Sequence, residues 1–287
     1  PWIRLRMNAD SSFASVHDLV GDLELHTVCR SAKCPNMHEC WGEGTATLML
    51  LGNECTRACR FCAIPAGRPK KLDLDEPRRA AEAAARMKLS HVVLTSVARD
   101  DLPDGGSGVF ADTIRAIRER LPQASVEVLT PDFQGDEGDL ARVLEARPDV
   151  FNHNLQTVSR LQPVIRPQAS YGRSLRVLKF VSEWTNPPAV KSGLMVGLGE
   201  TDDELRQSIR DLYDHGVRLL TLGQYLQPTR AHRPVDRFME PAKFEEMAEY
   251  AKGLGFKGVA SGPMVRSSYK AEELLRLARP REAAPTV

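Results

Sequence analysis

From Thr47 onward, the apolar and polar positions of the chain follow two alternating periods. Short apolar runs bounded by Gly, Asp or Pro are typical of buried strands, and apolar residues at three- and four-residue spacing are typical of helices. The predicted strands span 48–51, 91–97, 126–130, 149–155, 189–196 and 219–225, and the predicted helices span 77–87, 108–120, 136–146, 170–184, 201–215 and 241–253. A short apolar run at 256–260 follows the last helix.

This order of elements predicts an α/β fold with a parallel sheet, because strands that alternate with helices are joined by right-handed crossovers. Six strand–helix units favour a partial (β/α)6 barrel of the TIM type, with an open doubly wound sheet as the alternative. Thr201 precedes three acidic residues as an expected helix N-cap, and Gly216 is an expected helix stop. We expect an N-terminal extension over 1–47, the barrel over 48–260 and a C-terminal tail over 261–287, with both extensions covering the barrel mouth.

Composition excludes some classes of partner. The chain has 287 residues, with 39 basic and 38 acidic side chains and a net charge of +1, so bulk charge does not favour nucleic acid or anionic membranes. No apolar run approaches the roughly 20 residues that span a bilayer, and residues 1–4 show no signal-peptide core. All six cysteines lie between Cys29 and Cys62, unlike a disulfide framework. We therefore expect no nucleic-acid or membrane partner and a reducing, cytoplasmic location.

The candidate chemistry begins with Cys55, Cys59 and Cys62 in the segment CTRACRFC. Thiolates at short, irregular spacing are typical of iron–sulfur sites, whereas structural zinc sites use paired C-x2-C motifs. Three ligands leave one iron of a four-iron cluster with an open coordination position. Because this loop follows the first predicted strand, it is expected at the carboxyl ends of the strands, where ligands bind in both candidate folds.

A second triplet, Cys29, Cys34 and Cys40, lies in the N-terminal extension. It predicts a second cluster, with a zinc knuckle or buried free thiols as the alternative. Several predicted strand ends are polar or rich in glycine and point toward the cysteine loop: TSVARDDLPDGG, NHNLQT, KSGLMVGLGE and LGQYLQPT.

The cysteine loop, with Phe61 before its last cysteine, resembles that of the radical S-adenosylmethionine superfamily. The resemblance is closer to the lipoyl synthase family and covers nearly the whole chain. It rests on segments in the family's order: CRSAKCPNMHECW, CTRACRFC, TSVARDDLPDGG, FNHNLQTV, KSGLMVGLGET, LGQYLQPT and RSSY. The chain departs from the family's pattern at Arg30 and Ser31, where acidic residues are usual, and at Gln156, where Glu is common. None of these is an expected cluster ligand.

The resemblance implies that Cys55, Cys59 and Cys62 hold a [4Fe-4S] cluster whose open iron binds S-adenosylmethionine and delivers the electron that yields a 5′-deoxyadenosyl radical. It implies a second [4Fe-4S] cluster on Cys29, Cys34, Cys40 and a serine of RSSY, for which we favour Ser268 over Ser267. A serine alkoxide is a hard ligand that is displaced more readily than thiolate. This cluster would supply the sulfur that a sulfurtransferase inserts at C6 and C8 of an octanoyl group, giving protein N6-(lipoyl)lysine.

The implied partners are an octanoylated lipoyl carrier protein (a dehydrogenase-complex E2 or the glycine cleavage H protein), a ferredoxin or flavodoxin electron donor, and cluster-assembly proteins. Basic residues that could guide an acidic carrier are Arg30, Lys33, Arg57 and Arg60, with solvated charges as the alternative. The expected contacts to S-adenosylmethionine are Phe61, Thr95, Ser96, Asn154, Lys191, Gln224 and Leu226.

Each of these sites has a structural alternative. Asn154 is also a turn former, Lys191 is also a rim residue, and His153 is more typical of packing than of proton transfer. The Ser267-Ser268 pair is also typical of a helix N-cap. Two other functions stay open from the residues: a two-cluster radical enzyme with a different product, and a two-cluster electron carrier.

Overall fold

The described part of the chain is organised around one curved sheet. The computed structural model describes residues 21, 23, 25–28, 34, 36, 46–69 and 72–278. The strands lie in the order β1 to β8 across the sheet; β1 pairs antiparallel with β2, and every later neighbour is parallel. The strands are β1 (His26–Thr27), β2 (Thr47–Leu50), β3 (His91–Ser96), β4 (Ser125–Leu129), β5 (Val150–Asn152), β6 (Ala189–Val196), β7 (Leu219–Gln224) and β8 (Gly258–Gly262).

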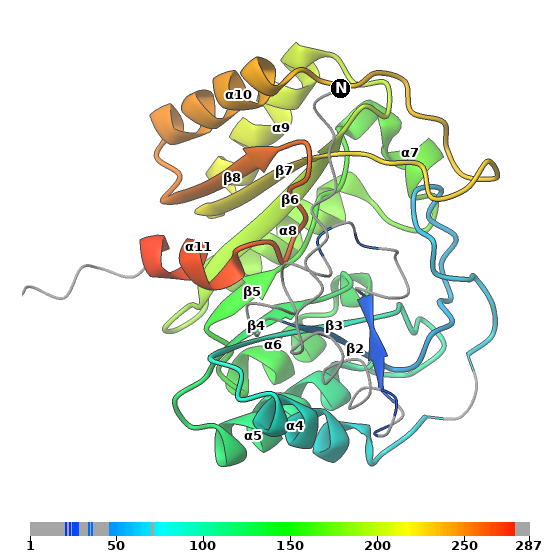
Figure 1. Cartoon of the computed structure of the whole chain (residues 1–287), viewed down its shortest axis with the longest axis vertical. Helices are drawn as coiled ribbons and strands as arrows, with labels where there is room; N and C mark the ends of the chain where they lie inside the picture. Colours follow the sequence, from blue (N-terminus) through cyan, green and yellow to red (C-terminus); the bar gives the residue numbers. More distant parts are fainter. Residues whose placement is uncertain are drawn as a thin grey trace, which may run out of the picture.

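Helices connect the parallel strands and line the outer face of the sheet. Figure 1 shows α4 and α5 beside the first strands and α9 and α10 beside the last. The main apolar core lies between the sheet and these helices, where Leu94 and Val128 meet Ile114 and Leu140. The helices are α4 (Glu76–Arg86), α5 (Ser107–Arg120), α6 (Glu137–Glu145), α7 (Gln162–Ile165), α8 (Tyr171–Ser182), α9 (Asp202–Asp214), α10 (Pro241–Leu254) and α11 (Ala271–Ala278).

The predicted α/β partial barrel is confirmed. Strand order follows chain order from β2 to β8, whereas a doubly wound sheet reverses its order at one point. Among the described residues β8 pairs only with β7, so the barrel stays open between its first and last strands. The short run predicted at 256–260 becomes β8, a seventh parallel strand.

Several local predictions are sharpened. Thr201 caps α9 in a reciprocal capping box with Glu204, as its sequence indicates. The predicted strand at 149–155 is too long: β5 ends at Asn152, and the next residues form the loop that reaches the site. The small elements β1, α7 and α11 were not predicted, because none has enough residues for a clear period. Most of the 1–47 extension lies outside the described residues.

The inner face of the sheet carries buried polar side chains. Lys191 on β6 donates from Nζ to Glu127 Oε1 on β4 at 2.8 Å, and both side chains are fully buried. Asn152 donates to the same carboxylate oxygen at 3.1 Å. Burial alone would raise the pKa of Glu127, but the charges and hydrogen bonds of Lys191 and His91 hold it below its usual value. A charged network therefore fills the middle of the barrel.

The chain after β8 turns back across the sheet. Leu274 and Leu275 of α11 pack against Val150, Ala189 and Leu219, which begin strands β5, β6 and β7. The α11 helix therefore closes the amino end of the barrel, opposite the strand ends at which the cysteine loop begins. Residues 263–270 connect these two ends. No helix among the described residues is long and apolar enough to cross a bilayer.

The substitution Lys191→Met should reduce the free energy of unfolding by about 3–5 kcal/mol, because it leaves the Glu127 carboxylate buried without its counter-charge. Chemical denaturation of the cluster-free chain measures this loss. Lys252→Met, which breaks the exposed pair with Glu249, is the matched control and should change stability little. The double variant Glu127→Leu/Lys191→Met should recover most of the loss. If Lys191→Met and Lys252→Met lowered the free energy of unfolding equally, the burial of the Lys191–Glu127 pair would not explain the loss.

Candidate functional site

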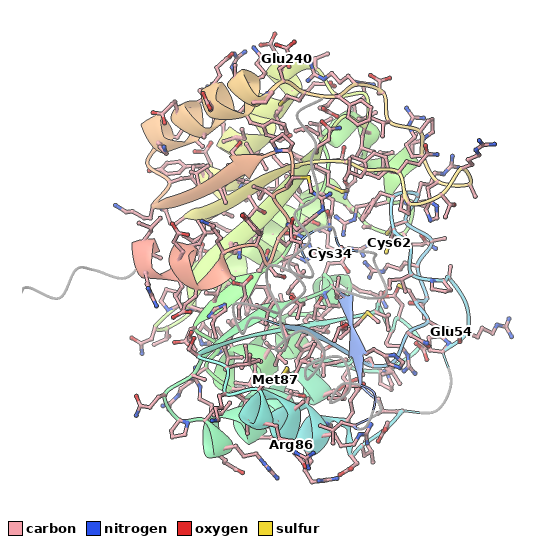
Figure 2. The ribbon with its side chains drawn as sticks, viewed as in Figure 1. Cys34, Glu54, Cys62, Arg86, Met87 and Glu240 are labelled. Atoms are coloured by element: carbon pink, nitrogen blue, oxygen red, sulfur yellow. The ribbon has the colours of Figure 1, made fainter. Side chains whose placement is uncertain are left out.

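The cysteine loop leaves the carboxyl end of β2 and is fixed to the neighbouring strand ends by its backbone. Cys55 N donates to Pro65 O, and Gly67 N donates to Cys55 O, both at 2.9 Å. The backbone N–H of Ala98, just after β3, donates to Cys55 Sγ at 3.3 Å. Cys55, Cys59 and Cys62 are all reduced and partly buried. Figure 2 labels Cys62 on this loop.

The surroundings of these thiols fit a multi-iron cluster. Burial raises the pKa of Cys59, and burial together with the charges of Cys59 and Cys55 raises the pKa of Cys62 to about 11. A bound cationic centre compensates such buried thiolates. Among the described residues, no three His, Cys, Asp or Glu side chains converge as one metal ion requires. In a four-iron cluster each thiolate binds a separate iron, so three separate thiolates on one loop are compatible with such a cluster.

Arg57, between the first two cysteines, ties this loop to the strand ends. Its Nε and Nη2 donate to both oxygens of Asp100 at 2.7 Å, and Nη2 also donates to Asp132 Oδ1 at 2.6 Å. The Arg57 side chain is 5% exposed and that of Asp132 is fully buried. The prediction that Arg57 guides a docking partner is therefore wrong, because its charge is enclosed between two carboxylates. Arg60 is exposed, as that prediction requires, and Arg30 and Lys33 lie outside the described residues.

Some of the side chains predicted to contact S-adenosylmethionine have unpaired polar atoms among the described residues, and others already hydrogen-bond to the protein. Ser96 Oγ is buried without a hydrogen-bond partner in the described region, and so is Asn154 Oδ1. Thr95 Oγ1 instead donates to Leu129 O at 2.8 Å. Gln224 Nε2 donates to three backbone carbonyls, so its side chain holds the β7 loop in place.

Lys191 is in the wrong place for its predicted role. Its ammonium is fully buried against Glu127 below the mouth, and a cofactor carboxylate would have to displace that partner. Phe61 and Leu226 lie partly buried. Phe61 packs against the apolar cluster of Val158, Leu161, Ile165, Leu198 and Tyr225. Its partly buried ring therefore offers an apolar surface to a planar group of the cofactor beside the cysteine loop.

Arg166 is a site residue that the sequence reasoning missed. Its side chain is 7% exposed, and its positive charge partly offsets the rise that burial causes in the pKa of Cys59. Its Nη1 also donates to the carbonyls of Asn154 and Leu155, at 3.3 and 3.2 Å. Its Nε has no partner among the described residues. A buried guanidinium beside Cys59 with a donor that no described residue pairs can bind a carboxylate. The short α7 turn that positions Arg166 gave no periodic signal.

The second cysteine triplet is described only at Cys34, since Cys29 and Cys40 lie outside the described residues. Cys34 is reduced and partly buried, and it lies within the electrostatic influence of Arg266 of the RSSY motif. Asn36 Nδ2 donates to Met264 O at 2.7 Å across 228 residues of sequence. The N-terminal extension therefore contacts the segment that carries the two serines. Cys34 is labelled in Figure 2.

The serine pair does not cap a helix. The α11 helix begins at Ala271, after Lys270 with a φ of +50°. Ser267 and Ser268 lie in the preceding turn, in which Tyr269 N donates to Arg266 O at 2.9 Å. Ser268 Oγ has no hydrogen bond within the described residues, and Ser267 Oγ accepts one from Asn154.

His153 and the predicted aspartate turn have structural roles. The His153 ring contacts Thr130 O and Ser174 Oγ, and burial lowers its pKa to about 4. Asp104 accepts from the backbone of Gly106 and Gly108, as expected for a turn. The expectation that His153 packs and does not act as a base agrees with these contacts.

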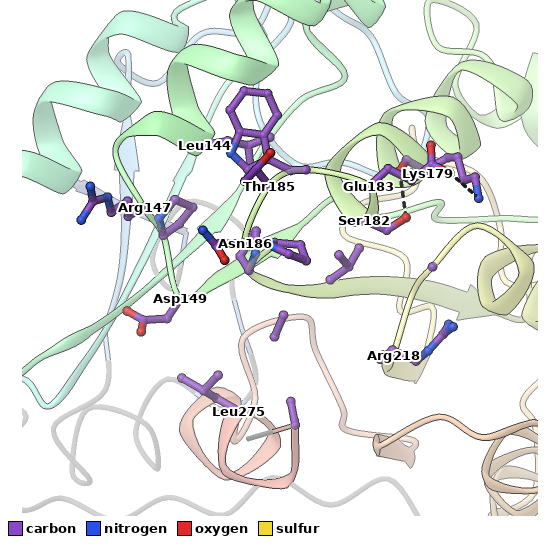
Figure 3. A pocket seen from close by; sticks show the side chains of 18 of the residues that line it. Leu144, Arg147, Asp149, Lys179, Ser182, Glu183, Thr185, Asn186, Arg218 and Leu275 are labelled. Carbon is purple, nitrogen blue, oxygen red and sulfur yellow. Dashed lines mark hydrogen bonds and ion pairs between the residues drawn. The ribbon is translucent and has the colours of Figure 1, made fainter. Parts of the chain in front are cut away.

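A large cavity of the described chain lies away from the cysteines. It encloses about 1330 Å³ and is lined by residues before strands β5, β6 and β7, at the amino end of the barrel. Figure 3 shows Arg147, Lys179 and Arg218 around it. Because barrel enzymes act at the carboxyl ends of their strands, we place the chemistry at the cysteine loop and not in this cavity.

Comparisons with known proteins first define the class. The family described as the Radical SAM superfamily matches residues 49–212, which is more than half of the chain. Solved structures with this fold include methylornithine synthase (TM-score 0.56, 13% identity, 85% of this chain and 81% of that chain). SuiB of Streptococcus suis bound to S-adenosylmethionine gives a TM-score of 0.57 at 10% identity, over 76% of this chain and 50% of that one.

Curated relatives then define the particular family. The lipoyl synthase of Rubrobacter xylanophilus is 52% identical over 278 residues, covering 97% of this chain and 87% of the relative. That of Chlorobaculum parvum is 53% identical over 272 residues, covering 94% and 93%. The chain belongs to the lipoyl synthase family of the radical S-adenosylmethionine superfamily. Its superfamily implies a [4Fe-4S] cluster and S-adenosylmethionine as cofactors, and the resemblance seen in the sequence is confirmed.

The substitution Asp132→Asn should destabilise the chain near neutral pH. Burial alone would raise the pKa of Asp132, but the hydrogen bond and charge of Arg57 hold it at about 2, below its reference of 3.8. A group with a depressed folded-state pKa stabilises the fold above its unfolded pKa and loses that contribution as pH falls through the folded value. The expected contribution is about 2 kcal/mol.

Denaturation of the cluster-free chain at several pH values checks this expectation. The difference between the wild type and Asp132→Asn should be largest above about pH 5 and should shrink as pH falls from about 4 to 2. A difference that stays constant over this range would show that the Arg57–Asp132 charge pair does not cause it.

Proposed function

We propose that this chain inserts two sulfur atoms, at C6 and C8, into an octanoyl-lysine on a lipoyl carrier protein. The sulfur comes from an auxiliary [4Fe-4S] cluster held by Cys29, Cys34, Cys40 and Ser268. The observation that carries the proposal is the contact between the N-terminal extension and the RSSY segment, where Asn36 donates to Met264 O and Cys34 lies near Arg266. Ligands more than 200 residues apart in sequence can meet only through such a contact.

The radical half of the site would use the loop after β2. Cys55, Cys59 and Cys62 would hold the other cluster, which supplies the electron that cleaves S-adenosylmethionine. In place of Lys191, Arg166 is our candidate for the methionine carboxylate, because its buried guanidinium keeps an unpaired Nε beside Cys59. Ser96, Asn154, Phe61 and the backbone at Leu226 would contact the rest of the cofactor. Arg57 holds the loop in place.

Each insertion replaces one C–H bond of the octanoyl chain with one C–S bond. The abstracted hydrogen leaves in 5′-deoxyadenosine, so two S-adenosylmethionine molecules serve one product. The proposed division is an N-terminal extension over 1–47, a barrel over 48–260 and a tail over 261–287. The barrel would make the radical, and the two terminal segments would hold the sulfur source. A ferredoxin or flavodoxin donor, cluster-assembly proteins and a cytoplasmic location complete the proposal.

Mass spectrometry of an octanoylated carrier peptide tests this function. The anaerobically reconstituted chain, which should hold about eight irons, is reduced in the presence of S-adenosylmethionine and the peptide. The expected product carries two added sulfurs, with 5′-deoxyadenosine formed alongside. Deoxyadenosine with a peptide of unchanged mass would favour a different two-cluster radical enzyme. The absence of deoxyadenosine would favour an electron carrier.

The substitution Ser268→Cys should keep the auxiliary iron but suppress sulfur insertion. A thiolate is a softer ligand than an alkoxide and is displaced less readily from iron, so the cluster would resist dismantling. Iron content should match the wild type while the yield of inserted sulfur falls by at least about tenfold. Formation of 5′-deoxyadenosine without the peptide is the internal control and should persist. An unchanged product yield would reject the idea that the serine weakens this corner of the cluster.

A further inference from the structure

A hydrogen bond from a barrel residue, Asn154, holds the side chain of Ser267. Its Oγ accepts a hydrogen bond from Asn154 Nδ2 at 2.5 Å, across 113 residues of sequence. Asn154 is 5% exposed and lies just beyond the carboxyl end of β5. The contact therefore joins the RSSY turn to a strand end on the radical side of the site.

The sheet makes room for this contact. A Cβ placed on Gly193 of β6 would lie 2.8 Å from Asn154 Oδ1, closer than side chains tolerate. A Cβ on Gly223 of β7 would lie 2.2 Å from the carbonyl oxygen of Val265. Both strands thus present bare backbone where the Asn154 amide and the segment before RSSY pass. Any larger residue at Gly223 would push that segment out of its path.

Asn154 is also tied to the cysteine loop. Its carbonyl accepts from Arg166 Nη1 at 3.3 Å, and the charge of Arg166 acts on the thiol of Cys59. Hydrogen bonds therefore connect Arg166, beside the cysteine loop, through Asn154 to Ser267. No hydrogen bond joins the adjacent Ser268 hydroxyl to another described residue, whereas Ser267 accepts one from Asn154.

We infer that Ser267 is a positioning residue: by accepting the Asn154 hydrogen bond it fixes the RSSY turn against the barrel and leaves Ser268 to serve as the auxiliary ligand. The inference rests on the proposed function, because it needs a cluster at that turn. It assigns different roles to two adjacent serines that the sequence alone does not distinguish.

The experiment uses the full chain with Cys55, Cys59 and Cys62 replaced by Ala, so that only the auxiliary cluster contributes iron and a spectrum. In this background Ser267→Ala should retain the cluster, with the spectrum of the parent, but should lose iron to a chelator about tenfold faster. One lost hydrogen bond of about 1.4 kcal/mol corresponds to that factor. Ser267→Thr, which keeps the hydroxyl, should restore the parent rate. Ser268→Ala should instead change the spectrum.

Asn154→Ala supplies a double-mutant cycle. Because both single changes break the same hydrogen bond, Ser267→Ala/Asn154→Ala should release iron no faster than the faster single variant. Ser261→Ala in β8 is the matched control, since it removes a serine hydrogen bond to Phe244 O of α10. The control should leave iron release unchanged.

Three outcomes would overturn the inference. A changed spectrum in Ser267→Ala together with a parent spectrum in Ser268→Ala would make Ser267 the ligand. Additive effects, near a hundredfold in the double variant, would show that the Asn154 contact does not act through Ser267. A rate unchanged by Ser267→Ala would remove the positioning role. Failure of the proposed function looks different: the parent chain would then bind no auxiliary iron before either serine is changed.

Discussion

The arrangement of the site depends on the buried Arg57 guanidinium, which two carboxylates share. Asp100 follows β3 and Asp132 follows β4, so one side chain of the cysteine loop joins the ends of three adjacent strands. Arg173 of α8 also reaches Asp132, at 3.2 Å. A buried charge pair of this kind is costly unless its geometry is well satisfied, so its main effect is to specify one arrangement. These contacts hold the loop between the first two cysteines in its observed path over the mouth.

The charged interior of the barrel sets a second constraint, which limits how deep an apolar substrate can bind. Lys191, Glu127 and Asn152 occupy its middle, and a charged network excludes an apolar chain from that depth. An octanoyl group would consequently stay near the mouth, above this layer. Among the described residues, Phe61 and Met195 are partly buried apolar side chains that pack on the buried cluster around Tyr225 and could contact such a chain. Placement of both proposed clusters near the mouth agrees with that depth limit.

The sequence predicted what depends on local period and missed what depends on long-range pairing. The six long helices and the strands between them follow from apolar spacing, and the Thr201 cap follows from a local motif. The cysteine spacing was enough to indicate a cluster. By contrast, the burial of Arg57 and Lys191 depends on Asp132 and Glu127, which lie 75 and 64 residues away. No periodic pattern reports such partners, so the sequence suggested a docking charge for Arg57 and a cofactor contact or rim residue for Lys191.

Arg166 and Ser267 are two further residues whose roles depend on a contact that the sequence does not reveal. Each gains its role from a contact with Asn154, a residue that the sequence presented as either a turn former or a cofactor contact. The structure gives Asn154 a third role as a junction: its carbonyl faces Arg166, its amide faces Ser267, and its Oδ1 is unpaired within the described residues. If the auxiliary cluster is dismantled to supply sulfur, the turn that carries Ser268 must keep its place while its ligand is lost. An anchor on the barrel does this, because β5, which Asn154 follows, is held by backbone pairing with β4 and β6 and not by cluster ligands.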